Sequence, residues 1–181
     1  MKEGQPAITL MIAFCDSRVD PAILMDCDPG DLFLVRNAAN LVRPWESAGH
    51  YHGTSAALEF AVNHLQVENI IVMGHANCGG IHALWHDDGT TASQFIHPWV
   101  SIAQAAKDKV KVSHAEYETG EQLTACEQAA ILVSLDNLLS FTCIKERVEQ
   151  GNLSLHGWFF DVRIGELFSY RPERDQFLAV D

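Results

Sequence analysis

The sequence lacks the features that would place it among membrane or nucleic-acid-binding proteins. No apolar run approaches the roughly 18 residues that a membrane-spanning helix needs. Basic residues are also scarce, because 12 Lys and Arg stand against 24 Asp and Glu and give a formal net charge of −12. Binding to phosphate backbones needs clustered positive charge. We therefore expect neither nucleic acid nor a membrane as a partner.

The sequence also lacks a regular cysteine framework. An odd number of cysteines, five, stands at irregular spacing, which is a poor pattern for disulfides. Cys27, Cys126 and Cys143 are best interpreted as free thiols in a reducing compartment, whereas Cys15 and Cys78 lie inside motifs. The N-terminal apolar run has no small-residue cleavage site and continues into a predicted strand, so it is a poor signal peptide. These observations predict a cytoplasmic protein.

Short apolar runs alternate with helical patterns along the chain. Three of these runs are bounded by polar or turn residues, which is typical of strands buried in a parallel sheet; they span residues 7–14, 32–35 and 69–73. A later pair, residues 157–162 and 166–170, is joined through Gly165 and predicts an antiparallel hairpin at the sheet edge.

Two helical patterns lie between these strands. Residues 54–65 place their apolar side chains on one face. Residues 122–150 are apolar almost all round, so this helix is expected to be buried and to kink or break. The alternation predicts an α/β fold with a central, mainly parallel β-sheet, flanking helices and an antiparallel edge strand. At this length we expect a single domain over residues 1–181.

The third predicted strand is followed by a histidine and a cysteine that could share a metal ion. His75 and Cys78 are three residues apart, and imidazole and thiolate are both zinc ligands. Cys78 is expected to open the next helix, where amide groups and the helix dipole favour a thiolate. Gly79 and Gly80 would let backbone approach closely. The alternative is a polar turn with a buried cysteine.

The first predicted strand ends in Asp16 and Arg18. Two residues apart in extended chain, these side chains point the same way and can form an ion pair. The pair could be purely structural. It could instead hold the Asp16 carboxylate ionised, ready to accept a hydrogen bond from a metal-bound water. Ligands of parallel sheets bind beyond the carboxyl ends of the strands, where both motifs are expected.

In these motifs and their order, the chain resembles the β-class carbonic anhydrases. That family carries Cys-x-Asp-Ser-Arg and, further on, Gly-His-x-x-Cys-Gly-Gly. The matching segments here are 16–19 (DSRV), 35–40 (VRNAAN), 52–59 (HGTSAALE), 74–80 (GHANCGG), 125–128 (ACEQ) and 156–161 (HGWFFD). They occur in the family's order and span nearly the whole chain.

The resemblance implies a zinc enzyme that hydrates CO₂ reversibly to bicarbonate and a proton. In the family, two cysteines and a histidine hold Zn²⁺, which lowers the pKa of a bound water toward ~7. The motif aspartate, paired with arginine, orients the resulting hydroxide toward CO₂. Carried over, His75 and Cys78 are two zinc ligands, and Asp16 and Arg18 form the catalytic dyad. The family also implies a homodimer or homotetramer, and the aromatic segment 158–160 supplies apolar surface for it.

The first motif departs from the family at Phe14. The family's first zinc cysteine lies two residues before the aspartate; here that position holds Phe14, and the cysteine is Cys15. Strand side chains alternate, so Cys15 reaches the metal only through a twist or bulge. Otherwise Asp16 ligates zinc permanently, or the metal is lost. The chain is also short of the family's N-terminal helical arm, since only residues 1–6 precede the first predicted strand.

Three functions remain open at this point. The leading hypothesis is a zinc-dependent carbonic anhydrase, possibly weakened by Phe14. A second is a hydrolase of CS₂ or COS on the same fold, because access to the site would set that difference. A third is a non-catalytic family member that serves as a metal-binding or oligomeric scaffold, and Phe14 is the feature that favours it.

Overall fold

The predicted α/β architecture is confirmed by a computed structural model, which describes residues 7–47, 52–87 and 93–180. Its strands are β1 (Thr9–Phe14), β2 (Leu32–Asn37), β3 (Asn69–His75), β4 (Ser154–Asp161), β5 (Glu166–Arg171) and β6 (Gln176–Ala179). They form one sheet in the order β2-β1-β3-β4-β5-β6. The first four pair in parallel, and β5 and β6 complete the sheet as antiparallel strands.

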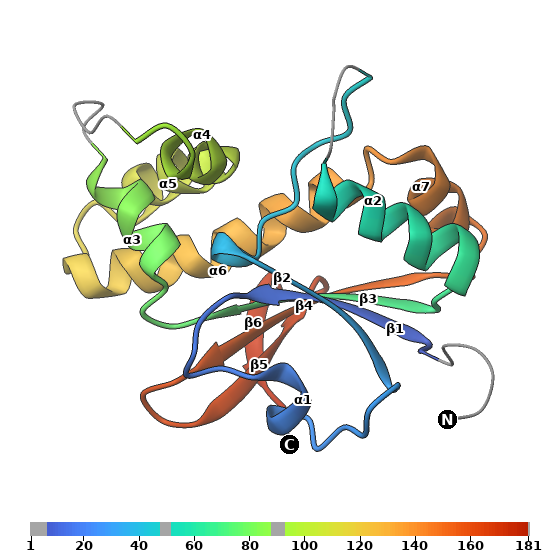
Figure 1. Ribbon diagram of the computed structural model, residues 1–181. Helices are drawn as coiled ribbons and strands as arrows, with labels where there is room; N and C mark the ends of the chain where they lie inside the picture. Colours follow the sequence, from blue (N-terminus) through green and yellow to red (C-terminus); the bar gives the residue numbers. More distant parts are fainter. Residues whose placement is uncertain (1–6, 48–51, 88–92, 181) are drawn as a thin grey trace.

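The helices are unevenly divided between the two faces of the sheet. Their bounds are α1 (Pro21–Leu24), α2 (Gly53–Glu59), α3 (Gly79–His86), α4 (Ile96–Val100), α5 (Gln104–Ser113), α6 (Thr119–Leu138) and α7 (Thr142–Glu149). In Figure 1, α2, α6 and α7 cover one face, and α3, α4 and α5 gather at one end of that layer. The short α1 lies on the opposite side. In the described part of the chain, no helix is long and apolar enough to span a bilayer.

The central strands are buried on both faces, as their continuous apolar runs predicted. Leu10 and Ile12 pack into the core beneath α2, α6 and α7. Met11 and Ala13 pack into a second core on the opposite face. All four are at most 1% exposed. Because side chains of a strand alternate between faces, both faces of β1, which lies between β2 and β3, are covered.

Three local features differ from the expectations or refine them. The long helical pattern breaks, because α6 ends at Leu138 and α7 begins at Thr142. Ser140 lies in this break, and its hydroxyl oxygen accepts a hydrogen bond from the backbone N–H of Trp45 at 2.8 Å. The pattern over residues 54–65 continues from α2 into a π-helical segment at Phe60–Leu65. Strand β6 was not predicted; the turn after Arg171 returns the chain to pair with β5.

Candidate active site

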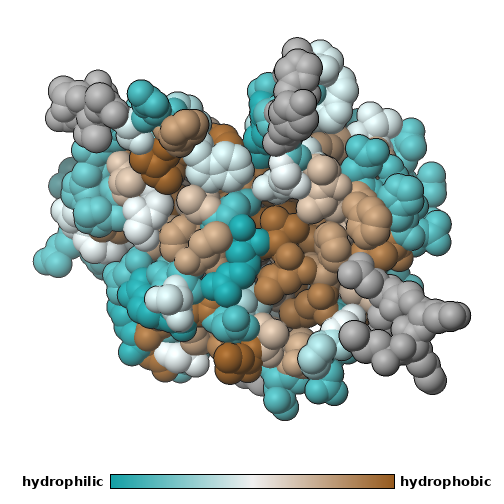
Figure 2. All heavy atoms as spheres, viewed as in Figure 1, coloured by the Kyte–Doolittle hydropathy of each residue, from teal (hydrophilic) through white to brown (hydrophobic). Residues whose placement is uncertain are grey.

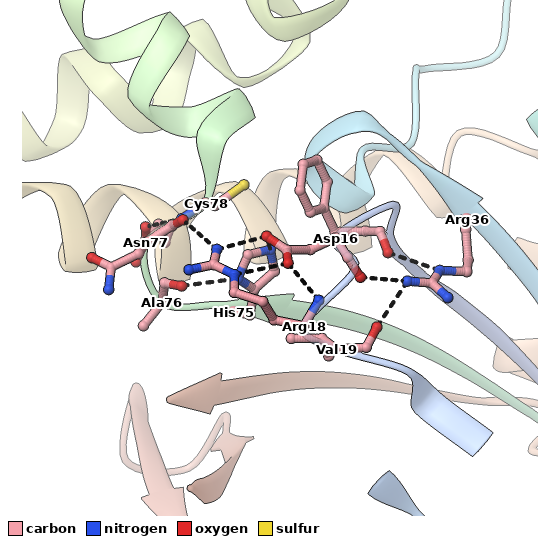
Figure 3. A network of polar contacts seen from close by, with 10 residues as sticks. Asp16, Arg18, Val19, Arg36, His75, Ala76, Asn77 and Cys78 are labelled. Atoms are coloured by element: carbon pink, nitrogen blue, oxygen red, sulfur yellow. Dashed lines mark hydrogen bonds and ion pairs between the residues drawn. The ribbon is translucent and has the colours of Figure 1, made fainter. Parts of the chain in front are cut away.

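The two predicted motifs meet at the carboxyl edge of the parallel sheet. Asp16 and Arg18 follow β1, His75 ends the neighbouring strand β3, and Cys78 precedes α3. Figure 3 shows the side chains of Asp16, Arg18 and His75 linked by polar contacts, with Cys78 close to them. Adjacent parallel strands end at the same edge, so residues far apart in sequence converge there.

Asp16 and Arg18 form the predicted contact. The Arg18 Nε and Nη2 groups donate to the two Asp16 carboxylate oxygens at 2.9 and 2.6 Å, and the Arg18 backbone N–H donates at 2.8 Å. Arg18 Nη2 also donates to the carbonyl oxygen of Asn77 at 3.2 Å. Hydrogen bonds from Arg18 hold the pKa of Asp16 well below its ordinary value. Asp16 therefore remains an ionised acceptor at neutral pH.

Arg36, on β2, fixes the backbone that carries this pair. Its Nε donates to the carbonyl oxygen of Phe14 at 3.0 Å, and its Nη2 donates to those of Asp16 and Val19 at 2.7 and 2.8 Å. These contacts are visible in Figure 3. The segment that contains Arg36 resembles the family, but no role was predicted for this residue. The available signal was a single charged residue near the end of a strand that begins with four apolar residues.

His75 presents a buried nitrogen that has no hydrogen-bond partner within residues 7–47, 52–87 and 93–180. The side chain is 1% exposed, and its Nδ1 lies 2.9 Å from the Ala76 carbonyl oxygen. A carbonyl oxygen only accepts, so Nδ1 carries the proton and Nε2 keeps its lone pair. Nε2 is unsatisfied and lies 3.8 Å from Asp16 Oδ2. Burial lowers the pKa of His75, which favours the neutral form that ligates metals.

Cys78 is buried and is not the preformed thiolate that its place before α3 predicted. Burial raises the pKa of its thiol to about 11. The backbone amides of Gly80 and Ile81 act in the opposite direction, but their effect is smaller. Desolvation of the buried thiol therefore outweighs the stabilisation that the start of α3 offers to a thiolate. A metal ion that binds Cys78 would have to displace the thiol proton.

Phe14, and not Cys15, faces this edge of the site. The Phe14 ring centroid lies 5.0 Å from that of His75, and Phe14 packs against the buried cluster that contains Cys78. Cys15 is exposed, and its backbone N–H donates to the Asn37 carbonyl oxygen at 3.0 Å. The pairing of β1 with β2 runs without interruption to Phe14. The bulge that would have turned Cys15 inward is therefore not formed.

The donor set fits a zinc site that has one thiolate fewer than the family's. His75 and Cys78 supply a neutral imidazole and a buried thiol, and Asp16 is the carboxylate beside them. Within the described ranges, no three His, Cys, Asp or Glu side chains are grouped as a metal site. The unsatisfied Nε2 of His75 is the observation that favours a cation there, because a buried polar atom without a partner is costly.

Glu127 is a further residue of the site to which sequence reasoning gave no role. From α6, its Oε1 accepts the backbone N–H of Cys78 at 2.8 Å. The residue is 5% exposed, its Oε2 has no hydrogen-bond partner among the described residues, and burial raises its pKa to about 7. Glu127 thus holds the backbone of Cys78 in place. A glutamate within an apolar helical pattern was the signal that could have identified it.

Gly80 is required where the turn before α3 meets the segment after β2. A Cβ at Gly80 would lie 2.8 Å from the Ala39 Cβ, whereas one at Gly79 would meet nothing within 4 Å. Ala39 cannot easily move, because it is buried and holds a left-handed φ of 62°. The close backbone approach predicted for the two glycines thus applies to Gly80.

We expect Gly80→Ala to destabilise the protein by about 1–3 kcal/mol through overpacking. Gly79→Ala is the matched control and should change the free energy of unfolding little. Urea unfolding measures the free energy of unfolding of both variants, provided that its dependence on urea concentration (the m-value) is unchanged. Equal effects of the two substitutions would contradict the packing account.

Comparisons with known proteins show the family of this chain. The carbonic anhydrase family model matches residues 9–167. The chain is 46% identical over 163 residues to β carbonic anhydrase 5, chloroplastic, of Arabidopsis thaliana, covering 89% of this chain and 53% of that protein. It is 38% identical over 175 residues to β carbonic anhydrase 6, mitochondrial, of the same plant, covering 96% and 60%. The chain belongs to the β-carbonic anhydrase family.

Solved structures place the fold in the same family. The β-carbonic anhydrase CcaA superposes with a TM-score of 0.92 at 32% identity, over 98% of this chain and 85% of that one. A structure from a study of two tetrameric β-carbonic anhydrases of Sordaria macrospora gives 0.78 at 29% identity, over 92% and 81%. The chain spans between about half and three-fifths of the length of the two Arabidopsis relatives.

The expectation of a cytoplasmic location is wrong. The two Arabidopsis relatives are named as chloroplastic and mitochondrial proteins. The expectation rested chiefly on free cysteines, and free thiols report the redox state of a compartment rather than its identity.

Proposed function

We propose that this chain catalyses the reversible hydration of CO₂ to bicarbonate and a proton, with Zn²⁺ held by His75 and Cys78. The observation that carries the proposal is the buried, unpartnered Nε2 of His75 beside the Asp16–Arg18 pair. Family membership supports the reaction class. Zinc bound at these residues would lower the pKa of water toward ~7 and so supply hydroxide at neutral pH.

The protein side chains would then position the reactants. Asp16 remains ionised, because Arg18 donates to both of its carboxylate oxygens, and it can accept a hydrogen bond from the nucleophile. The geometry of Asp16 depends on Arg36, which holds the Asp16 carbonyl oxygen at 2.7 Å. The Phe14 ring, which packs against His75, stands at the position of the family's first zinc cysteine. We therefore propose a weakened zinc site.

The direct test is a stopped-flow CO₂ hydration assay on the zinc-depleted and the zinc-reconstituted protein. We expect activity that returns with zinc and is lost again on chelation. If reconstituted protein hydrates CO₂ no faster than buffer, the chain is a non-catalytic member of the family. Hydrolysis of COS or CS₂ without CO₂ hydration would assign it to the other enzyme class.

Arg18→Ala should lower CO₂ hydration by about tenfold or more, because Asp16 loses the partner that keeps it ionised and oriented. Arg163→Ala is a matched control. Arg163 holds Asp161 through the same Nε and Nη2 contacts at 2.8 and 2.6 Å, but this second pair lies at the end of β4, whose last residue is Asp161, and not after β1. Comparable rate losses in the two variants would remove Arg18 from the mechanism.

We also propose a homodimer or homotetramer. The aromatic segment 158–160 is a weaker argument than expected, since Phe159 is 2% exposed and packs inside the chain. The edge strand β2 supplies the better surface, because its Leu34 is exposed. Phe60, the first residue of the π-helical segment after α2, is exposed as well. Figure 2 shows hydrophobic residues gathered on this face. A monomer by light scattering at micromolar concentration would contradict the proposal.

A further inference from the structure

Helix α3 carries two exposed histidines that the proposed reaction does not use. His82 and His86 are four residues apart on its solvent side. Their ring centroids lie 4.2 Å apart, and the ring planes are tilted by 46°. Within the described part of the chain, neither imidazole hydrogen-bonds to another residue. Both side chains are therefore available to a ligand from solvent.

This spacing suits a metal chelate. Residues at positions i and i+4 of a helix lie on one face, one above the other. Imidazole nitrogens bind zinc, copper and nickel, and two histidines at this spacing on one helix can share a single ion. The two rings are already in contact, so a metal ion would not have to bring distant side chains together.

We propose that His82 and His86 form a second metal site, an exposed two-histidine chelate for a divalent late transition-metal ion. Water would complete the coordination, because the helix supplies two ligands. The site is distinct from the one at His75 and Cys78, since those two side chains are at most 2% exposed. The proposal does not depend on the reaction that the chain catalyses.

A neighbouring histidine serves as the control. His97 and His86 line the same cavity of about 150 Å³ between α3 and α4. The Nδ1 of His97 is in contact with the Asp87 carboxylate, so His97 already has a partner and is not expected to contribute.

The test is titration of tag-free protein with Ni²⁺ by calorimetry, in a Cys78→Ser background that disables the other site. We expect one Ni²⁺ per chain. Either His82→Gln or His86→Gln should weaken binding at least tenfold, because a chelate needs both rings, whereas His97→Gln should leave it unchanged. Binding that survives each single substitution, or that is lost with His97→Gln, would overturn the proposal.

Thermal unfolding supplies a second readout in the same proteins. An ion that binds the folded helix and not the unfolded chain raises the unfolding midpoint. The midpoint should rise with Ni²⁺ in the Cys78→Ser protein and in its His97→Gln derivative. It should not move in the His82→Gln or His86→Gln derivatives. A midpoint that Ni²⁺ raises equally in all four proteins would contradict the chelate.

Discussion

Phe14→Cys should raise both zinc affinity and CO₂ hydration, the latter by about tenfold or more. The substitution places a thiol two residues before Asp16, on the side of β1 that faces His75. It also removes a phenyl ring that has no lone pair to offer a metal. Zinc content after dialysis and the stopped-flow hydration rate measure the two effects.

The control for this gain is a substitution that removes the ring without adding a metal ligand. Phe14→Ala removes the same phenyl group but adds no sulfur, so it should leave zinc affinity low. If Phe14→Ala improves zinc binding as much as Phe14→Cys does, steric blockage by the ring and not the missing thiolate is the defect. If neither variant binds more zinc than the parent, our account of Phe14 is wrong.

Cys78→Ser should weaken zinc binding by about 100-fold or more and remove the hydration activity. A structural zinc site releases ~10–16 kcal/mol in total, so each ligand carries several kcal/mol. A site that already lacks one thiolate binds zinc weakly, so the loss of a further ligand should abolish most of the remaining affinity. Competition with a chromophoric chelator measures the zinc affinity.

Cys15→Ser is the matched control, because Cys15 is an exposed thiol one residue from Phe14. Its backbone is held by Asn37, and serine preserves that contact. We expect parental zinc affinity. A loss comparable to that of Cys78→Ser would show that the chain distorts on metal binding and brings Cys15 to the ion.

Local patterns predicted much of this molecule. Three of the four parallel strands followed from short apolar runs, because a strand buried on both faces must be apolar at successive positions. The predicted hairpin of β4 and β5 is confirmed, but the parallel pairing of β4 with β3 was not predicted. The Asp16–Arg18 contact was predicted from two-residue spacing in extended chain. The contact forms, but through a turn after β1 in which the backbone N–H of Val19 donates to the Asp16 carbonyl oxygen. Strand β6 was missed because its pairing depends on a turn after Arg171 rather than on an apolar run of its own.

The parts of the site that sequence reasoning missed depend on tertiary packing. Arg36 and Glu127 contact backbone groups of segments distant in sequence. A charged residue in an apolar pattern marks each of them, but no local pattern identifies the backbone group that it contacts. The state of Cys78 was mispredicted for the same reason. The helix start favours a thiolate, but burial, which comes from packing against distant residues, raises the thiol pKa to about 11.

The most direct test of the central claim is X-ray absorption at the zinc edge of the reconstituted protein. Our account predicts one sulfur ligand, from Cys78, with nitrogen and oxygen neighbours in the parent. It predicts two sulfur ligands at ~2.3 Å in Phe14→Cys. Two sulfur ligands in the parent would contradict the account, because Cys15 would then have replaced the thiolate that Phe14 removes.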